Sequence, residues 1–90
     1  MNDGSRVVLE LYNNTDQPRR IWMEPWGEEL FLPPNVTWHL VCDGPEPKPI
    51  SIEFHEDSIA IHGLPKSMVR IYCDNELIWE CFQPFDPPVA

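Results

Sequence analysis

Histidine, cysteine and carboxylate side chains are the groups of this chain that could hold a metal ion or move a proton. The candidate metal ligands are His39, His55, His62, Cys42, Cys73 and Cys81. Their spacing matches neither the C-x-x-C nor the H-x-x-x-H pattern of a zinc site, and a meeting of His55 with His62 across a hairpin would leave the site incomplete. The sequence has no glycine-rich phosphate loop and no G-x-S-x-G elbow. We therefore expect no metal, no cofactor and no catalytic residue.

Three carboxylates gather around one tryptophan. Glu24, Glu28 and Glu29 flank the sequence Pro25-Trp26-Gly27. A carboxyl group acts as a general acid or base where a cleft shifts its pKa. These residues fall at a predicted exposed turn, which favours solvated surface over catalysis. A small carboxylate-dependent hydrolase is therefore kept as an alternative function.

Aromatic side chains are a further group of candidate binding residues, since the 90 residues include four tryptophans. Trp38 and Trp79 are expected to fill the core. Trp26 lies at a predicted hairpin tip, where it either plugs the end of the core or forms a contact site for a protein or a sugar ring. The neighbouring Pro25 and Gly27 fix its direction and favour the plug. A sugar-binding β-sandwich that uses Trp26 is the second alternative.

Short strands must position all of these residues. Turn clusters rich in Pro, Asn, Asp and Gly recur roughly every 8–12 residues, a spacing typical of β-sandwiches and barrels. The predicted strands are 6–12, 19–24, 28–32, 36–42, 50–55, 58–62, 68–73 and 77–82. We therefore predict an all-β fold, a small β-sandwich or barrel of about eight short, mostly antiparallel strands. Residues 1–90 form one domain, with 1–5 and 83–90 as loose or extended tails.

The hairpin at 21–32 carries more apolar surface than one sheet face can hide. A three-residue loop at Pro25-Trp26-Gly27 would pair Glu24 with Glu28 and place Trp22 opposite Leu30. Its two faces then hold two apolar sets: Trp22, Leu30 and Leu32, and Ile21, Met23 and Phe31. Excess apolar surface on a small domain often marks an interface. The predicted interaction surface comprises Trp22, Trp26, Phe31, Glu24 and Glu28.

The net charge of the chain restricts the kinds of molecule that we expect it to bind. The net charge is −9 with only six Lys and Arg residues, which argues against binding to nucleic acid or to anionic lipid. No apolar stretch approaches the roughly 18 residues of a membrane span, and the first residues do not read as a signal peptide. The odd number of cysteines, three, favours free thiols in a reducing cytoplasm.

These features together predict a cytoplasmic, non-enzymatic protein-binding or adaptor module that uses the apolar hairpin at 21–32. This class includes immunity-like or inhibitor-like proteins, in which a small acidic protein neutralises a basic enzyme. The expected partner is another protein, and a second copy of this chain in a homodimer is the alternative. We expect no nucleic-acid or membrane partner.

The run Asn13-Asn14-Thr15, the segment 21–29 and the sequence Leu32-Pro33-Pro34 resemble a family of small bacterial proteins that share an E-P-W-G-E…L-P-P core. The similarity continues loosely through 59–63 and 69–74. It implies a compact β domain of bacterial origin, with no established activity and no catalytic residue to transfer. The chain departs from that pattern at Leu64, where an aromatic residue is expected, and in its Phe-Pro tail.

Overall fold

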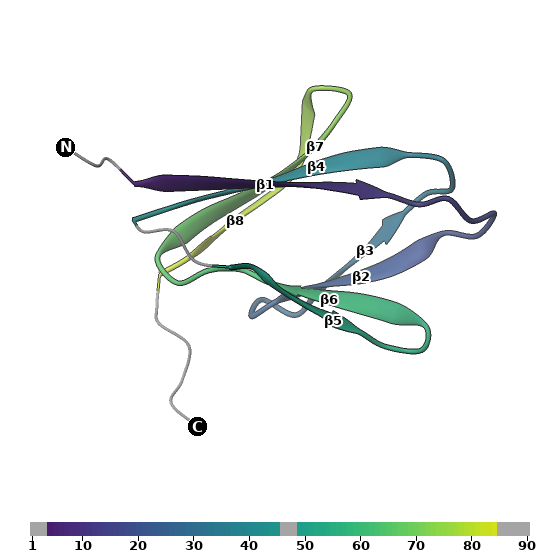
Figure 1. Cartoon of the computed structure of the whole chain (residues 1–90), viewed down its shortest axis with the longest axis horizontal. Coiled ribbons are helices and arrows are strands. Elements are labelled where there is room, and N and C mark those ends of the chain that lie inside the picture. The colour runs from purple at the N-terminus through teal and green to yellow at the C-terminus, as the bar shows by residue number, and fades with distance from the viewer. Residues whose placement is uncertain (1–3, 46–48, 85–90) are drawn as a thin grey trace.

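The computed structural model describes residues 4–45 and 49–84, which form two four-stranded sheets seen as two layers in Figure 1. The strands are β1 Ser5–Tyr12, β2 Arg19–Glu24, β3 Glu28–Leu32, β4 Thr37–Gly44, β5 Ser51–Phe54, β6 Ser58–His62, β7 Ser67–Cys73 and β8 Glu76–Gln83. Sheet A has the order β1-β4-β7-β8, and sheet B has the order β3-β2-β6-β5. Only β2 and β6 pair in parallel among the strands described. The predicted all-β sandwich of about eight mostly antiparallel strands is confirmed. No helix that could cross a membrane occurs in residues 4–45 and 49–84.

Turn residues end the strands close to the predicted positions. Gly27, Asn35, Asp74 and Asn75 all adopt positive φ angles, between 51° and 70°, a conformation that Gly and Asn tolerate best. Strand β1 begins at Ser5 and β8 extends to the buried Gln83, so both strands reach further than predicted. Of the predicted tails, residues 1–3 and 85–90 lie outside the described residues.

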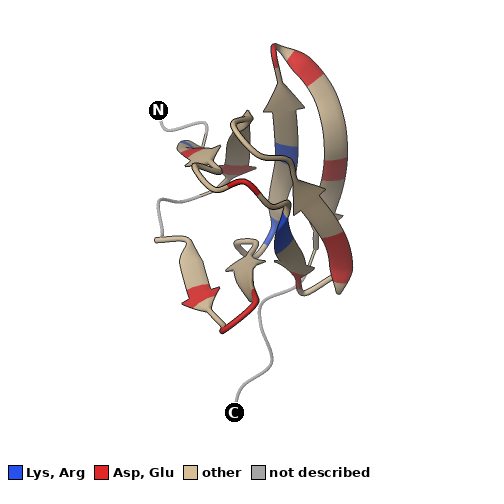
Figure 2. Ribbon diagram, turned by 90° about the vertical axis from the view of Figure 1, so that its right-hand side faces the viewer, with Lys and Arg blue, Asp and Glu red and all other residues tan. Residues whose placement is uncertain are grey.

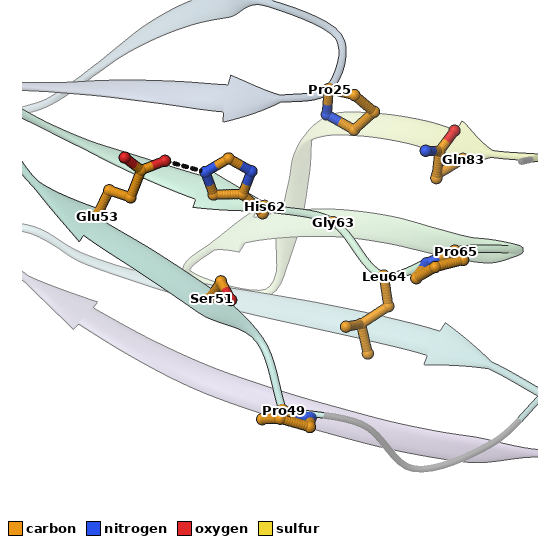
Figure 3. Close-up of a pocket in the computed structure, with 9 residues that line it drawn as sticks. All are labelled: Pro25, Pro49, Ser51, Glu53, His62, Gly63, Leu64, Pro65 and Gln83. Carbon is orange, nitrogen blue, oxygen red and sulfur yellow. Dashed lines mark hydrogen bonds and ion pairs between the residues drawn. The ribbon is translucent and has the colours of Figure 1, made fainter. Parts of the chain in front are cut away.

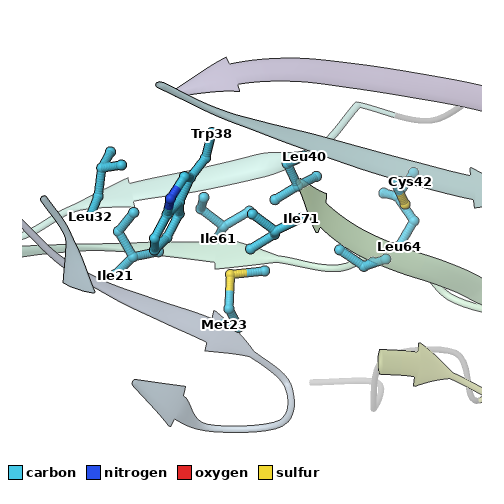
Figure 4. Close-up of a cluster of buried hydrophobic side chains, with 10 residues drawn as sticks. Ile21, Met23, Leu32, Trp38, Leu40, Cys42, Ile61, Leu64 and Ile71 are labelled. Atoms are coloured by element: carbon cyan, nitrogen blue, oxygen red, sulfur yellow. The ribbon is translucent and has the colours of Figure 1, made fainter. Parts of the chain in front are cut away.

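Side chains that alternate inward on both sheets form the core (Figure 4). The core residues that are at most 1% exposed are Ile21, Met23, Leu40, Cys42, Ile61, Val69 and Ile71. Burying each of the larger ones contributes about 1.5–3 kcal/mol of transfer free energy. Trp38 is buried among them as expected, whereas Trp79 is only half-buried and packs against the edge of this cluster.

The hairpin between β2 and β3 differs from the predicted one by one residue of register. Met23 pairs with Glu28 and Ile21 with Leu30, and Gly27 N donates to Met23 O at 2.9 Å to close a four-residue loop. A one-residue slip moves every side chain of a strand to the opposite face. The prediction of two apolar faces was therefore wrong. The inward face is apolar and belongs to the core, and the outward face mixes aromatic with charged side chains.

A ladder of charges crosses the outer face of sheet A from edge to edge. Arg6 Nε lies 2.7 Å from Asp43 Oδ1, Arg70 Nη1 lies 3.5 Å from Asp43 Oδ2, and Arg70 Nε lies 2.6 Å from Glu80 Oε2. Each of the four strands thus supplies one member. The hydrogen bond from Arg6 is the main reason that the pKa of Asp43 lies below its usual value.

Removing the Asp43 carboxylate should change how stability depends on pH. The folded state lowers the pKa of Asp43, so its contribution is present above the unfolded pKa of about 3.9 and is lost as the pH falls through the folded pKa. We expect Asp43→Asn to be less stable than the wild type at pH 7 and the two curves to converge below about pH 4. Urea unfolding at a series of pH values measures this. The matched control is Asp57→Asn, at a side chain that is 78% exposed, and a constant difference down to about pH 2 would contradict the prediction.

Candidate interaction surface

Alternate residues of sheet B form its outer face, and Trp22 lies at the centre of that face. The side chains on it are Arg20, Trp22, Glu24, Glu29, Phe31, Ser51, Glu53, Ser58, Ala60 and His62. Trp22 is half-buried between Glu29 of β3 and Ala60 of β6. Phe31 is 49% exposed. Three of the predicted residues, Trp22, Phe31 and Glu24, therefore share one face.

Arg20, which is not among the predicted surface residues, organises the aromatic part of this face. Its guanidinium carbon lies 5.8 Å from the centroid of the Phe31 ring, within cation–π range. Nε of Arg20 is buried 3.1 Å from Glu29 Oε2, although that contact is too poorly angled for a hydrogen bond. Nη1 lies 3.7 Å from Asp57 Oδ2. Arg20 thus packs on the ring of its cross-strand neighbour Phe31. The only sequence signal for this position is the alternation of residues 20, 22 and 24 on one strand face.

The other two predicted residues lie elsewhere. Trp26 reaches across to sheet A, where its Nε1 donates to Phe82 O at 3.2 Å and its ring meets Trp79 edge-on, with 5.3 Å between centroids. This packing favours the plug over the exposed contact site. Glu28 is exposed at the start of β3 and pairs with the inward-facing Met23, so it lies on the opposite side of the sheet from Trp22.

A cavity of about 530 Å³ adjoins the outer face of sheet B where β5 begins and β6 ends (Figure 3). It is lined by Pro25, Pro49, Ser51, Glu53, His62, Gly63, Leu64, Pro65 and Gln83. Glu53 lies between two histidines, with Oε1 2.5 Å from His62 Nε2 and Oε2 3.8 Å from His55 Nε2. The alternation of polar and apolar residues over 50–55 puts Glu53 on the polar side of its strand, but it does not indicate this cavity. The cavity offers apolar walls and one carboxylate.

The polar groups of the cavity suit the binding of a cation better than nucleophilic catalysis. Ser51 and His62 are cross-strand neighbours, yet His62 directs Nε2 to Glu53 rather than to Ser51. The Glu53 and His62 side chains are 57% and 40% exposed, so water reaches both. An activated nucleophile needs a base within hydrogen-bond distance and a preorganised site. An exposed carboxylate beside apolar walls can bind a cationic ligand without either of these.

The remaining metal-ligating side chains are dispersed. His39 Nε2 lies 3.3 Å from Glu10 Oε2 on the far sheet. The three cysteines are free thiols, and Cys81 pairs with Val69 while Cys73 pairs with Glu76. The described residues contain no group of three or more His, Cys, Asp or Glu side chains that could hold a metal ion.

Negative charge dominates the outer face of sheet B, where Glu24, Glu29 and Glu53 accompany one arginine, Arg20. Figure 2 shows acidic positions recurring on strands and turns with few basic ones between them. No family model, no curated protein and no solved structure matches this chain.

Proposed function

We propose that this protein is a non-enzymatic binding module that docks the outer face of sheet B onto a basic protein partner. The observation that carries the proposal is the pair of aromatic side chains, Trp22 and Phe31, surrounded by carboxylates on an open sheet face. Protein interfaces concentrate their binding energy in a few aromatic or arginine anchors near the centre. Charged residues at the rim steer and select the partner.

The aromatic centre is already ordered before any partner arrives. Arg20 stacks on Phe31 and pairs with Glu29, and Trp22 is half-buried over the small Ala60. Side chains held in this way lose little rotamer freedom when they bind. This supports a docking role for the face over a role as ordinary solvated surface.

The adjoining cavity fits a lysine or arginine side chain of the partner. Its prolines and Leu64 offer apolar walls for an aliphatic stem, and Glu53 offers a carboxylate for the charged end. The net charge of −9 draws a basic protein toward the whole molecule.

We place this activity in the bacterial cytoplasm as part of the same proposal. The free thiols support a reducing compartment, and the E-P-W-G-E…L-P-P resemblance supports a bacterial source. A small acidic protein that covers a basic enzyme would act as an inhibitor or immunity factor. The sugar-binding alternative is less supported because Trp26 is packed on sheet A.

Replacing Trp22 with alanine should weaken partner binding by about 2 kcal/mol, or roughly 30-fold in Kd, because it removes the central anchor. The immobilised wild type would be exposed to proteins of the native cell, and any protein that it retains and the bare matrix does not would be purified and tested against both the wild type and the variant. Calorimetric titration at two salt concentrations then gives its Kd. Binding should also weaken as salt rises, because the rim carboxylates are exposed.

The matched control is Phe54→Ala, which removes an exposed aromatic side chain from β5 outside this face. It should leave the Kd unchanged. A partner that binds the Trp22→Ala variant as tightly as the wild type, or an acidic partner, would contradict the proposal.

A further inference from the structure

A second cavity, of about 370 Å³, opens between the two sheets at the end of the sandwich where β1, β3 and β5 end and β2 and β6 begin. Figure 1 shows the β5–β6 hairpin diverging from β1 toward this end. The cavity that holds Glu53 adjoins the opposite ends of β5 and β6, so the two cavities are separate. Side chains from the core-facing sides of both sheets line the second cavity: Leu11, Arg19, Leu32, Ile52, Phe54 and Ile59.

Strand register places Arg19 and Phe54 on the core-facing side of sheet B. Arg19 is two residues from the fully buried Ile21 on β2, and it pairs with the buried Leu32 of β3. Phe54 of β5 pairs with Ile59 of β6, which in turn neighbours Ile21. Although this side of the sheet forms the core, Arg19 and Phe54 are both exposed, and Phe54 is 81% exposed. Within the described part of the chain, sheet A therefore leaves this end of sheet B uncovered.

Among the residues that the structure describes, Arg19 is the only arginine without a carboxylate partner. Each of the other three has a nitrogen 2.6–3.1 Å from a carboxylate oxygen: Arg6, Arg20 and Arg70. Glu10 also lines the cavity, but it is the cross-strand neighbour of His39 on the outer side of sheet A, where its Oε2 lies 3.3 Å from His39 Nε2. The Glu10 carboxylate is thus engaged on the other side of β1, and the Arg19 guanidinium is the free charge at the cavity.

We infer that this second cavity binds a free aliphatic carboxylate, with the hydrocarbon chain between the sheets and the carboxylate on Arg19. Leucine and isoleucine side chains supply the walls, and ligand sites of roughly 300–1,000 Å³ combine such walls with few polar groups. A guanidinium holds a carboxylate through two parallel hydrogen bonds. Because Arg19 is exposed, the charged end of the ligand stays at the mouth of the cavity, in contact with water.

The volume of the cavity sets the length of the hydrocarbon chain. If each non-hydrogen atom occupies about 30 Å³, the share of one water molecule in the liquid, a cavity of about 370 Å³ holds roughly twelve of them. Decanoate, a saturated carboxylate of ten carbons, has that number. A ligand of this size binds with a Kd of about 0.1–1 mM at the usual free energy per atom.

Calorimetric titration of the full chain with decanoate and with decylammonium at pH 7 tests the charge preference. The two probes have the same hydrocarbon chain and opposite charges. Decanoate should bind at least about tenfold more tightly, because only its charged end can accept hydrogen bonds from Arg19. Unspecific adsorption predicts the reverse order, since the net charge of −9 attracts cations to the rest of the surface. Equal or tighter binding of decylammonium would overturn the inference, as would no binding of decanoate up to about 5 mM.

Chain length and methyl NMR locate the hydrocarbon part of the ligand. From hexanoate to decanoate the Kd should fall roughly three- to fourfold per methylene group, because each one leaves water for the cavity. Decanoate should shift the methyl signals of Ile52 and Ile59, which line the cavity, and not that of Ile78, which is 42% exposed on β8. An affinity that is independent of chain length, or shifts confined to Ile78, would show adsorption to exposed apolar surface instead.

Substituting Arg19 tests its role directly. Arg19→Gln removes the charge from an exposed side chain, so it should weaken decanoate binding at least about tenfold and abolish the preference over decylammonium. The matched control is Arg6→Gln, which makes the same change of net charge on the outer face of sheet A and should leave the Kd within about twofold of the wild type. A thermal melt confirms that both variants are folded. Equal Kd values for Arg19→Gln and the wild type would overturn the assignment of Arg19 to the site.

Discussion

Asn13→Ala should lower the free energy of unfolding by about 3 kcal/mol, a large part of what a domain of this size possesses. The Asn13 side chain makes four hydrogen bonds while the residue is only 4% exposed. Nδ2 donates to Gln17 O at 2.8 Å and to Leu32 O at 3.0 Å, and Oδ1 accepts from Thr15 N at 3.0 Å and from Thr15 Oγ1 at 2.6 Å. Alanine removes all four, including the buried bond to Leu32 O, and that carbonyl then loses its side-chain donor.

The cost is large because Asn13 joins segments that are distant in sequence. It lies just after β1, bonds to the last residue of β3 and, through its backbone, to Val36 and Asn35 in the turn before β4. Urea denaturation with a check for two-state behaviour gives the free-energy change. The adjacent Asn14 is exposed, so Asn14→Ala should change stability by less than about 0.5 kcal/mol. Equal effects of the two substitutions would show that Asn13 is an ordinary turn residue.

The strands were predictable because their signals are local. The alternation of 50–54 and 58–62 and the turn residues between strands gave all eight strands to within one or two residues. The positive φ angles of Asn35, Asp74 and Asn75 explain why such residues stand there, since their short polar side chains stabilise this backbone conformation. Asn13 stands in the same kind of turn cluster, between the strands at 6–12 and 19–24. Its buried hydrogen bond reaches Leu32, which no local pattern connects to it.

Pairing between distant strands was not predictable from the sequence. The parallel contact of β2 with β6 brings Trp22 beside Ala60, and it alone places Trp22 on the face that also holds Glu53 and His62. The predicted register between β2 and β3 was wrong for a related reason. Pro25-Trp26-Gly27 suits a three-residue loop locally, but the observed four-residue loop also carries Trp26 to sheet A, where its partners are.

The structure brings only some of the five predicted surface residues together. Trp22, Phe31 and Glu24 lie on one face of sheet B, and their role in binding stays a prediction. Their neighbours Arg20 and Glu53 were not among the predicted surface residues, because a charged residue in a strand indicates only that its side chain faces solvent. Whether an aromatic side chain of a hairpin packs onto the other sheet or stays on the outer face depends on tertiary contacts. Trp26 packs on sheet A, whereas Trp22 lies on the outer face of sheet B.

Trp26→Ala should lower the free energy of unfolding by about 3 kcal/mol. This value is near the lower end of the range for replacing a packed aromatic side chain with alanine, because Trp26 is half-buried. The indole fastens the β2–β3 loop of sheet B to β8 of sheet A through Trp79 and the Phe82 carbonyl. Trp26→Phe keeps a ring but loses the hydrogen bond, so it should cost about 1 kcal/mol. Trp22→Ala should cost less than Trp26→Ala, since Trp22 lies on the outer face. Equal losses of unfolding free energy in the two alanine variants would contradict the assignment of Trp26 as a plug at the end of the core.

Gly63 supplies an independent test of the same contact. A Cβ at this position would lie 2.6 Å from Trp26 Cη2 and 3.0 Å from Cζ3, so Gly63→Ala must displace the indole and should cost about 1–3 kcal/mol. Once Trp26 is alanine the two closest contacts are gone and Val69 Cγ2, 3.3 Å from the Cβ position, is the remaining one, so adding Gly63→Ala should then cost less. The double-mutant cycle should therefore depart from additivity by about 1 kcal/mol or more, as expected for residues in contact. If the free-energy costs of the two substitutions simply add, Trp26 does not occupy the space above Gly63. That result would contradict the assignment of Trp26 as a plug at the end of the core.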